Sequence, residues 1–131
     1  MSDFATIFYH VWFSPKRRKW LLRGDVEILL RKLLPEIAKE KGIKLLASEL
    51  MVDHVHLLLE LNQNESLSKA INLLKGVTAR RVFQEFPELK FDAGVNHFWQ
   101  KRYGRKEVPP DAVSDVTGYI QTQWDRLEKY E

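Results

Sequence analysis

Hydrophobic positions along this chain recur with two different periods, and each period predicts one type of secondary structure. Short runs rich in β-branched and aromatic residues predict strands, and longer segments with apolar residues three or four positions apart predict amphipathic helices. The predicted strands cover residues 5–13, 43–50, 51–61 and 97–103. The predicted helices cover residues 25–41, residues 66–85 and a segment that starts near residue 110.

Turn and capping residues set the limits of these elements. Ser66 is a suitable N-cap for the second helix, and Gly42 is a C-terminal stop for the first. Pro35 lies inside the first helix and predicts a kink or a late break there. Residues 104–110 contain a Pro-Pro pair and predict a linker. The last helix has a narrow apolar seam, formed by Val113, Val116, Ile120, Trp124 and Leu127.

The order strand, helix, strand, strand, helix, strand predicts an α+β fold. It is the ferredoxin-like βαββαβ plan, an antiparallel sheet with both helices on one face, here followed by an additional C-terminal helix. A single domain is expected over residues 1–131, with a core at about 4–104 and the C-terminal helix at about 110–129. Side chains alternate along a strand, so Val55, Leu57 and Leu59 should face the helices. His54 and His56 should then face the open side of the sheet.

Composition narrows the classes of protein to consider. The chain has 131 residues, 44% of them hydrophobic and 30% charged, which is typical of a globular domain. It has no cysteine, which excludes disulfides and thiolate chemistry. The apolar run at residues 4–13 lacks a basic leader and is too short to span a membrane, so a cytoplasmic protein without membrane contact is expected.

Clusters of basic residues suggest an acidic polymer as partner. The net charge is only +3, but the pI is about 9.2. The alternative is that these clusters are solvated loops. Trp20, within the basic loop from Lys16 to Arg23, is suited either to stack on a base or to anchor that loop. The candidate contacts to nucleic acid are Lys16, Arg17, Arg18, Lys75, Arg80, Arg81, Lys101 and Arg102.

Two pairs of side chains carry candidate chemistry. His54 and His56, roughly 6.6 Å apart on one strand face, can bind one divalent metal, although an isolated pair of this kind is more often two ordinary histidines. Asp53 should point to the opposite face, so a third ligand must come from elsewhere. Tyr119 and Gln123, one helical turn apart, share one flank of the last helix. A tyrosine can act as a covalent nucleophile and Gln123 can be a neutral third ligand, whereas the alternative for Tyr119 is an amphipathic side chain at a helix edge.

Longer motifs resemble one family over nearly the whole chain. The sequence is similar to the single-tyrosine HUH transposases of small bacterial and archaeal insertion sequences. The similarity lies in YHVWFSPKRRKWLL (9–22), MVDHVHLLLEL (51–61), SLSKAINLLKGVTARRVFQEFPELK (66–90), HFWQKRYG (97–104) and YIQTQ (119–123).

The resemblance implies an enzyme that cleaves and rejoins single-stranded DNA at hairpin-bearing element ends through a 5′-phosphotyrosine intermediate. It implies Tyr119 as the nucleophile and His54, His56 and Gln123 as the metal ligands. Mg²⁺ or Mn²⁺ suits this mixed imidazole and amide set. It also implies a homodimer in which the C-terminal helix acts in trans. The segment GRKEVPPDA (104–112) departs from the family pattern, which leaves docking of that helix in cis open.

Two alternatives remain at this point. One is an inactive or domesticated relative that binds hairpin DNA or RNA without cutting it. The other is an unrelated binding module that uses an RRM-like sheet face, with Phe98 and Trp99 as stacking platforms.

Overall fold

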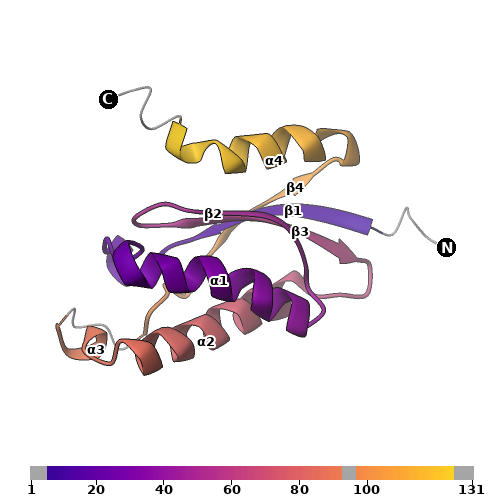
Figure 1. Ribbon diagram of the computed structural model, residues 1–131. Coiled ribbons are helices and arrows are strands. Elements are labelled where there is room, and N and C mark those ends of the chain that lie inside the picture. Colours follow the sequence, from indigo (N-terminus) through magenta and orange to yellow (C-terminus); the bar gives the residue numbers. More distant parts are fainter. Residues whose placement is uncertain (1–5, 93–96, 126–131) are drawn as a thin grey trace.

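Helices cover both faces of a four-stranded antiparallel sheet. The computed structural model describes residues 6–92 and 97–125. Figure 1 shows α1 and α2 side by side on one face of the sheet and α4 alone on the other. The strands are β1 (Thr6–Phe13), β2 (Lys44–Leu50), β3 (Val55–Asn62) and β4 (Gly104–Val108), in the order β2-β3-β1-β4.

The helical elements complete the predicted plan. They are η2 (Lys16–Arg18), α1 (Gly24–Glu40), α2 (Leu67–Glu85), α3 (Leu89–Asp92), η3 (Pro110–Ala112) and α4 (Val113–Gln121). This element order and strand order confirm the ferredoxin-like fold with an extra C-terminal helix. None of the helices within the described ranges is long and apolar enough to cross a bilayer.

The caps of α1 and α2 follow the sequence signals. Ser66 Oγ accepts a hydrogen bond from the Lys69 N–H at 3.2 Å, which confirms the predicted N-cap of α2. Gly42 follows α1 with a φ of 70°, a conformation that glycine adopts without steric cost. Pro35 does not break α1, which continues to Glu40. The lost backbone hydrogen bond is tolerated because the neighbouring leucines and Ile37 are buried against the sheet.

The prediction of the fourth strand was wrong in position. Phe98 and Trp99 are buried in the core, and only the pair Pro15–Trp99 forms an isolated bridge within the predicted strand 97–103. The strand instead occupies residues 104–108, which were predicted as a linker. β4 is a short edge strand with three exposed polar residues, and edge strands need little apolar character to pair. Burial of Phe98 and Trp99 also removes the RRM-like alternative, which requires exposed aromatic platforms.

The two faces of β3 pack against different cores, as the alternation predicts. Val55, Leu57 and Leu59 join the main core beneath α1 and α2. Leu58 on the opposite face joins a smaller core with Ile120 of α4. β3 begins at Val55 rather than Met51, so His54 lies between the bend at residues 52–53 and the strand.

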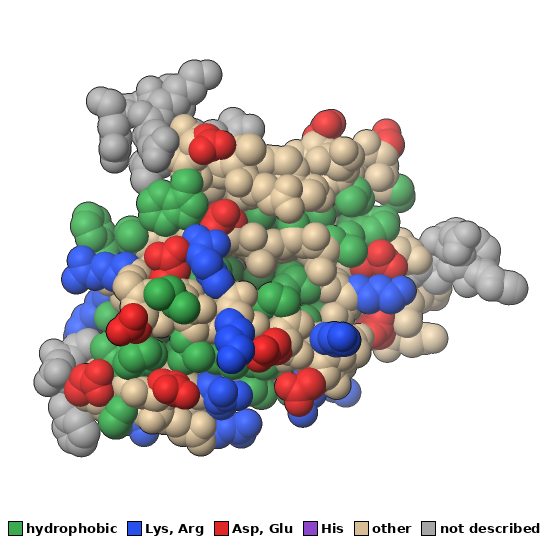
Figure 2. Space-filling model, viewed as in Figure 1, with side chains coloured by type: hydrophobic (Ala, Val, Ile, Leu, Met, Phe, Trp, Pro, Cys, Tyr) green, Lys and Arg blue, Asp and Glu red, His purple; other side chains and the backbone are tan. Residues whose placement is uncertain are grey.

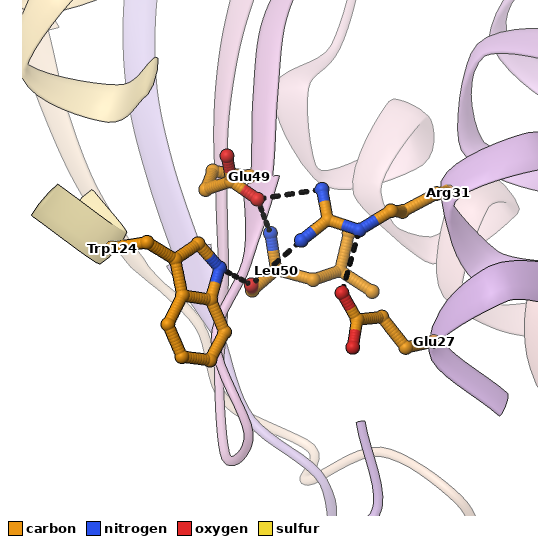
Figure 3. A network of polar contacts seen from close by, with 5 residues as sticks. All are labelled: Glu27, Arg31, Glu49, Leu50 and Trp124. Atoms are coloured by element: carbon orange, nitrogen blue, oxygen red, sulfur yellow. Dashed lines mark hydrogen bonds and ion pairs between the residues drawn. The ribbon is translucent and has the colours of Figure 1, made fainter. Parts of the chain in front are cut away.

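α4 packs in cis, on the sheet of its own chain. α4 ends at Gln121, residues 123–125 are again helical up to the last described residue, and Leu127 of the predicted seam lies beyond the described residues. The indole Nε1 of Trp124 donates to the Leu50 carbonyl at 2.8 Å, and an Arg31 guanidinium N–H donates to the same oxygen at 3.3 Å. Arg31 also pairs with Glu27 and Glu49 (Figure 3). These contacts connect α1 to the chain that follows α4 across the end of β2.

Candidate active site

A cavity of about 620 Å³ lies between α4 and the uncovered part of the sheet. The packing of Ile120 on Ala47, Leu58 and Val108 holds α4 over one part of this sheet face. The cavity forms beside that contact, where the face carries polar side chains. Its lining includes His10, Arg18, His54, His56, Lys106 and Tyr119.

Three imidazoles form a chain in this cavity. His54 Nε2 lies 3.1 Å from His56 Nε2, and His56 Nδ1 lies 3.0 Å from His10 Nε2. The predicted strand spacing between His54 and His56 does not apply, because His54 lies before the first residue of β3 and its ring approaches that of His56. His10, in β1, was missed by the sequence analysis. Antiparallel pairing places His10 opposite Leu58, two positions from His56, so both histidines face the same side.

Asp53 orients His54 instead of pointing to the opposite face. Its Oδ1 lies 2.8 Å from His54 Nδ1, and its Oδ2 accepts from Arg18 at 3.0 Å. The sequence prediction assumed strand alternation, which fails because residue 53 lies in the turn. An Nδ1–H that donates to a carboxylate leaves the Nε2 lone pair of His54 free to face His56. Partial burial would raise the pKa of Asp53, but hydrogen bonds and charges from His54 and Arg18 outweigh it and lower that pKa.

The turn that presents Arg18 has an unfavourable backbone conformation. Arg17 and Arg18 have φ values of 62° and 53°, in the left-handed region that non-glycine residues rarely adopt. Such residues persist where the surrounding structure holds them, commonly at functional sites. Here the turn directs the Arg18 guanidinium to Asp53 and into the lining of the cavity.

Burial keeps two of the imidazoles neutral. His56 is 9% exposed, and desolvation, followed by the charges of His54 and His10, lowers its pKa to about 4. Desolvation and the nearby Lys106 also lower the pKa of His10. Near neutral pH these rings therefore stay unprotonated and keep lone pairs that can accept a hydrogen bond or bind a cation.

The two Nε2 atoms fit one divalent cation. Ligand bonds of about 2.1 Å at a right angle place neighbouring donors about 3.0 Å apart, close to the separation seen between His54 and His56. The third donor is not assembled. The Gln123 amide donates to the Tyr119 carbonyl at 2.7 Å, along the helix rather than into the cavity. Within the described part of the chain, no group of three or more His, Asp or Glu side chains is arranged to hold a metal ion.

Tyr119 faces the imidazoles of its own chain. Its ring centroid lies 6.2 Å from that of His56 and 6.1 Å from that of His10, both nearly perpendicular. The side chain is 42% exposed, so the phenol is accessible from the cavity. Trans docking of the helix in a dimer stays a prediction, since the structure contains one chain.

The predicted nucleic-acid contacts separate into different surroundings. Lys75 is buried, and its ammonium donates to the carbonyls of Gln100, Lys101 and Arg102 at 2.7, 3.3 and 3.0 Å. It therefore has a structural role that differs from the predicted contact with DNA. Its off-stripe position on α2 was misleading, because the chain before β4 covers that side of the helix.

The other predicted cations are not all near the cavity. Arg18 lines it, whereas Arg80 and Arg81 belong to α2, on the opposite face of the sheet. Lys16, Lys101 and Arg102 border a separate hollow beside Trp99. Lys106 was not among the predicted contacts, yet pairing of β4 with β1 brings it opposite His10. The face shown in Figure 2 has Lys and Arg interspersed with Asp and Glu, so it offers no continuous basic patch.

Comparison with known proteins shows the family of this chain. The family model described as "Transposase IS200 like" matches residues 3–123. The ISDra2 transposase TnpA of Deinococcus radiodurans is 32% identical over 118 residues, which cover 90% of this chain and 84% of that protein. The transposase for insertion sequence element IS200 of Salmonella typhimurium is 30% identical over 115 residues, covering 88% and 75%.

Solved structures share the fold. The crystal structure of a candidate transposase from Deinococcus radiodurans superimposes with a TM-score of 0.73 at 32% identity and covers 90% of this chain and 91% of that one. A REP-associated tyrosine transposase bound to a REP hairpin has a TM-score of 0.64 at 15% identity, with 88% and 65% covered. From its sequence and fold, this chain belongs to the family of IS200-like transposases.

Proposed function

We propose that this transposase cleaves and rejoins single-stranded DNA through a covalent bond between Tyr119 and a 5′-phosphate. The observation that carries the proposal is the position of the Tyr119 ring, edge-on to His56 and His10 in one cavity. Arg18 and Lys106 bring positive charge to the same cavity, which favours a bound phosphodiester.

The proposed reaction is a transesterification. A bond forms from Tyr119 Oη to the scissile phosphorus while the bond from phosphorus to the 3′-oxygen breaks. The phenol releases its proton and the departing 3′-oxygen takes one up from solvent, so protons balance overall. The phosphodiester bond is conserved in the phosphotyrosine, and a 3′-hydroxyl of another strand can therefore reverse the reaction without ATP.

His54 and His56 are the residues that would hold Mg²⁺ or Mn²⁺, through their imidazole nitrogens. When bound, such a cation supplies neutralisation of charge on the phosphate. Asp53 keeps His54 in the tautomer with its Nε2 lone pair toward the site, and the low pKa of His56 keeps that ring neutral. Gln123 would have to leave the Tyr119 carbonyl to become the third ligand, which a rotation of its side chain permits.

DNA hairpins at element ends are the proposed substrate. The structurally similar REP-associated tyrosine transposase was solved with a hairpin, which supports this class of ligand for the present fold. Arg80 and Lys101 border one hollow outside the cavity. Together with Arg81 they are the cations that would hold duplex phosphates while the single strand enters the site.

Substitution of Tyr119 tests the chemistry. Tyr119→Phe should abolish the covalent protein–DNA adduct and leave hairpin affinity nearly unchanged. Tyr103→Phe is the matched control, because the Tyr103 hydroxyl pairs with Ser68 Oγ at 2.9 Å and lies outside the cavity lining. An adduct that persists in Tyr119→Phe and disappears in Tyr103→Phe would contradict the assignment. Binding without any adduct in the native protein would favour the inactive, hairpin-binding alternative.

Removal of the metal tests the histidine pair. EDTA should stop cleavage by the native protein, and His54→Ala should stop it even with excess Mg²⁺ or Mn²⁺. Both treatments should leave binding of the hairpin largely intact, because phosphate contacts do not involve the imidazoles. Full cleavage in EDTA would limit His54 and His56 to a structural role.

Mixing of two inactive variants tests the predicted homodimer. Tyr119→Phe and His54→Ala proteins should each be inactive, and a heterodimer regains one complete site only if Tyr119 serves the partner's histidines. Recovery of cleavage would support trans docking. No recovery, with heterodimers demonstrated, would support the cis arrangement of α4 found in the single chain.

A further inference from the structure

Trp12 is a half-exposed aromatic side chain at the edge of the catalytic cavity. It is 38% exposed and lines the cavity together with His54 and Tyr119. β1 lies between β3 and β4, and Trp12 pairs with His56 on one side and with Gly104 on the other. Cross-strand neighbours point to the same face, so the indole lies on the face that carries the imidazoles.

The indole of Trp12 packs against the main chain at Gly104. A Cβ at position 104 would overlap the Nε1, Cε2 and Cζ2 atoms of Trp12. The indole therefore leans over the main chain of β4, into space that any other residue at 104 would fill. The φ of Gly104 is not positive, so its backbone conformation does not require glycine. Glycine is needed here because a side chain would collide with the indole.

The surroundings of Trp12 combine an aromatic surface with positive charge. The His10 ring lies 5.1 Å from the indole at 58°, and Lys106 and Arg18 line the same cavity. Proteins that bind single-stranded DNA use this combination, because bases stack on aromatic rings while cations follow the phosphates. The ordinary role of a half-exposed tryptophan on a sheet face would be packing, and neither of the two hydrophobic cores includes Trp12.

We propose that Trp12, seated on Gly104, is the stacking platform for one unpaired base beside the scissile phosphate. The proposal rests on the function proposed above, since it assigns a nucleotide subsite to the same cavity. Stacking uses the ring face of the base and not its hydrogen-bonding edge. The subsite therefore requires that a base be present, and it favours the larger surface of a purine.

An abasic scan of the DNA tests the platform. The ligand is a hairpin oligonucleotide with a single-stranded flank, in which each flanking nucleotide in turn is replaced by an abasic analogue. Binding is measured with Tyr119→Phe protein, so that no DNA is cleaved. We expect one abasic position to weaken binding by about tenfold or more, the loss of one base–aromatic stack.

The decisive comparison is between variants. Trp12→Ala, in the same background, should weaken binding to intact DNA to a similar extent and should no longer respond to the abasic nucleotide at that position. Trp12→Phe should keep part of the response. Trp20→Ala is the comparison for a tryptophan outside the cavity, since Trp20 is 64% exposed but does not line it, and this variant should keep the full response to the abasic nucleotide.

Two outcomes would overturn the platform. One is an abasic effect of equal size in Trp12→Ala and the parent, because independent effects add. The other is the absence of any sensitive flanking position. If Trp12→Ala fails to fold, Trp12→Phe is compared with the parent instead. A smaller abasic effect in Trp12→Phe supports the platform, and an effect of equal size contradicts it. Because this assay measures binding alone, it can succeed or fail independently of the Tyr119 adduct.

Discussion

Acidification should destabilise this protein through His56, because the folded chain resists protonation of that ring. Desolvation lowers the pKa of His56 from 6.5 to about 4. Between these values the unfolded chain binds a proton that the folded chain does not, and the free energy of unfolding therefore falls as the pH falls. The contribution of His56 to the free energy of unfolding is fully present above the pKa of the unfolded chain. It is lost as the pH falls toward the pKa of the folded chain.

The size of the effect follows from the two pKa values. Between about pH 7.5 and about pH 5, one group with these pKa values lowers the free energy of unfolding by about 2 kcal/mol. For a chain of this length that corresponds to a fall of about 8 °C in Tm. His10 has its pKa shifted in the same direction and should add to the effect.

Thermal or urea unfolding across this pH range, in EDTA, measures the effect. His56→Gln should flatten the dependence of stability on pH. His97→Gln is the matched control for the replacement of a histidine, because His97 is exposed and lies outside the cavity lining. Equal pH dependence in His56→Gln and the native chain would refute the reasoning, as would a native chain that loses less than about 0.5 kcal/mol over the range.

Further substitutions test contacts that hold the site in place. Lys75→Met should lower the free energy of unfolding by about 2–3 kcal/mol, because three carbonyls before β4 lose a charged donor, and urea unfolding measures it. An unchanged midpoint would mean that water replaces the ammonium. Thr78→Val should cost about 1–2 kcal/mol, since the buried Trp99 Nε1–H loses its acceptor at 2.9 Å. Thr122→Val should cost less, because the Thr122 hydroxyl just after α4 makes an exposed hydrogen bond to the Gly118 carbonyl. Trp124 lies just after α4, and Trp124→Phe removes its hydrogen bond to the Leu50 carbonyl. We expect the cleavage rate to fall more than the affinity for the hairpin. Equal losses in both would argue against a positioning role for Trp124.

Periodicity alone determined most of the fold. The spacing of apolar residues placed β1, β2, α1 and α2 within one or two residues of their observed limits, and it assigned the two faces of β3 correctly. These features are local, because a helix or strand records its buried face in its own sequence. The motifs around His54, His56 and Tyr119 added the family, since they recur as a set.

Only the tertiary structure decided which side chains meet. His10 joins the imidazole chain because β1 pairs with β3 in one register, and a sequence window around residue 10 contains no sign of that register. β4 was misplaced because aromatic residues at 97–103 look like a strand, although Phe98 and Trp99 serve the core and polar residues 104–108 form the edge. Asp53 contacts His54 because residue 53 lies in a turn, where the alternation of side chains along a strand does not apply. The first two cases depend on pairing or burial between segments distant in sequence, and the third depends on the conformation of a local turn. None of them can be derived from the apolar spacing within one segment.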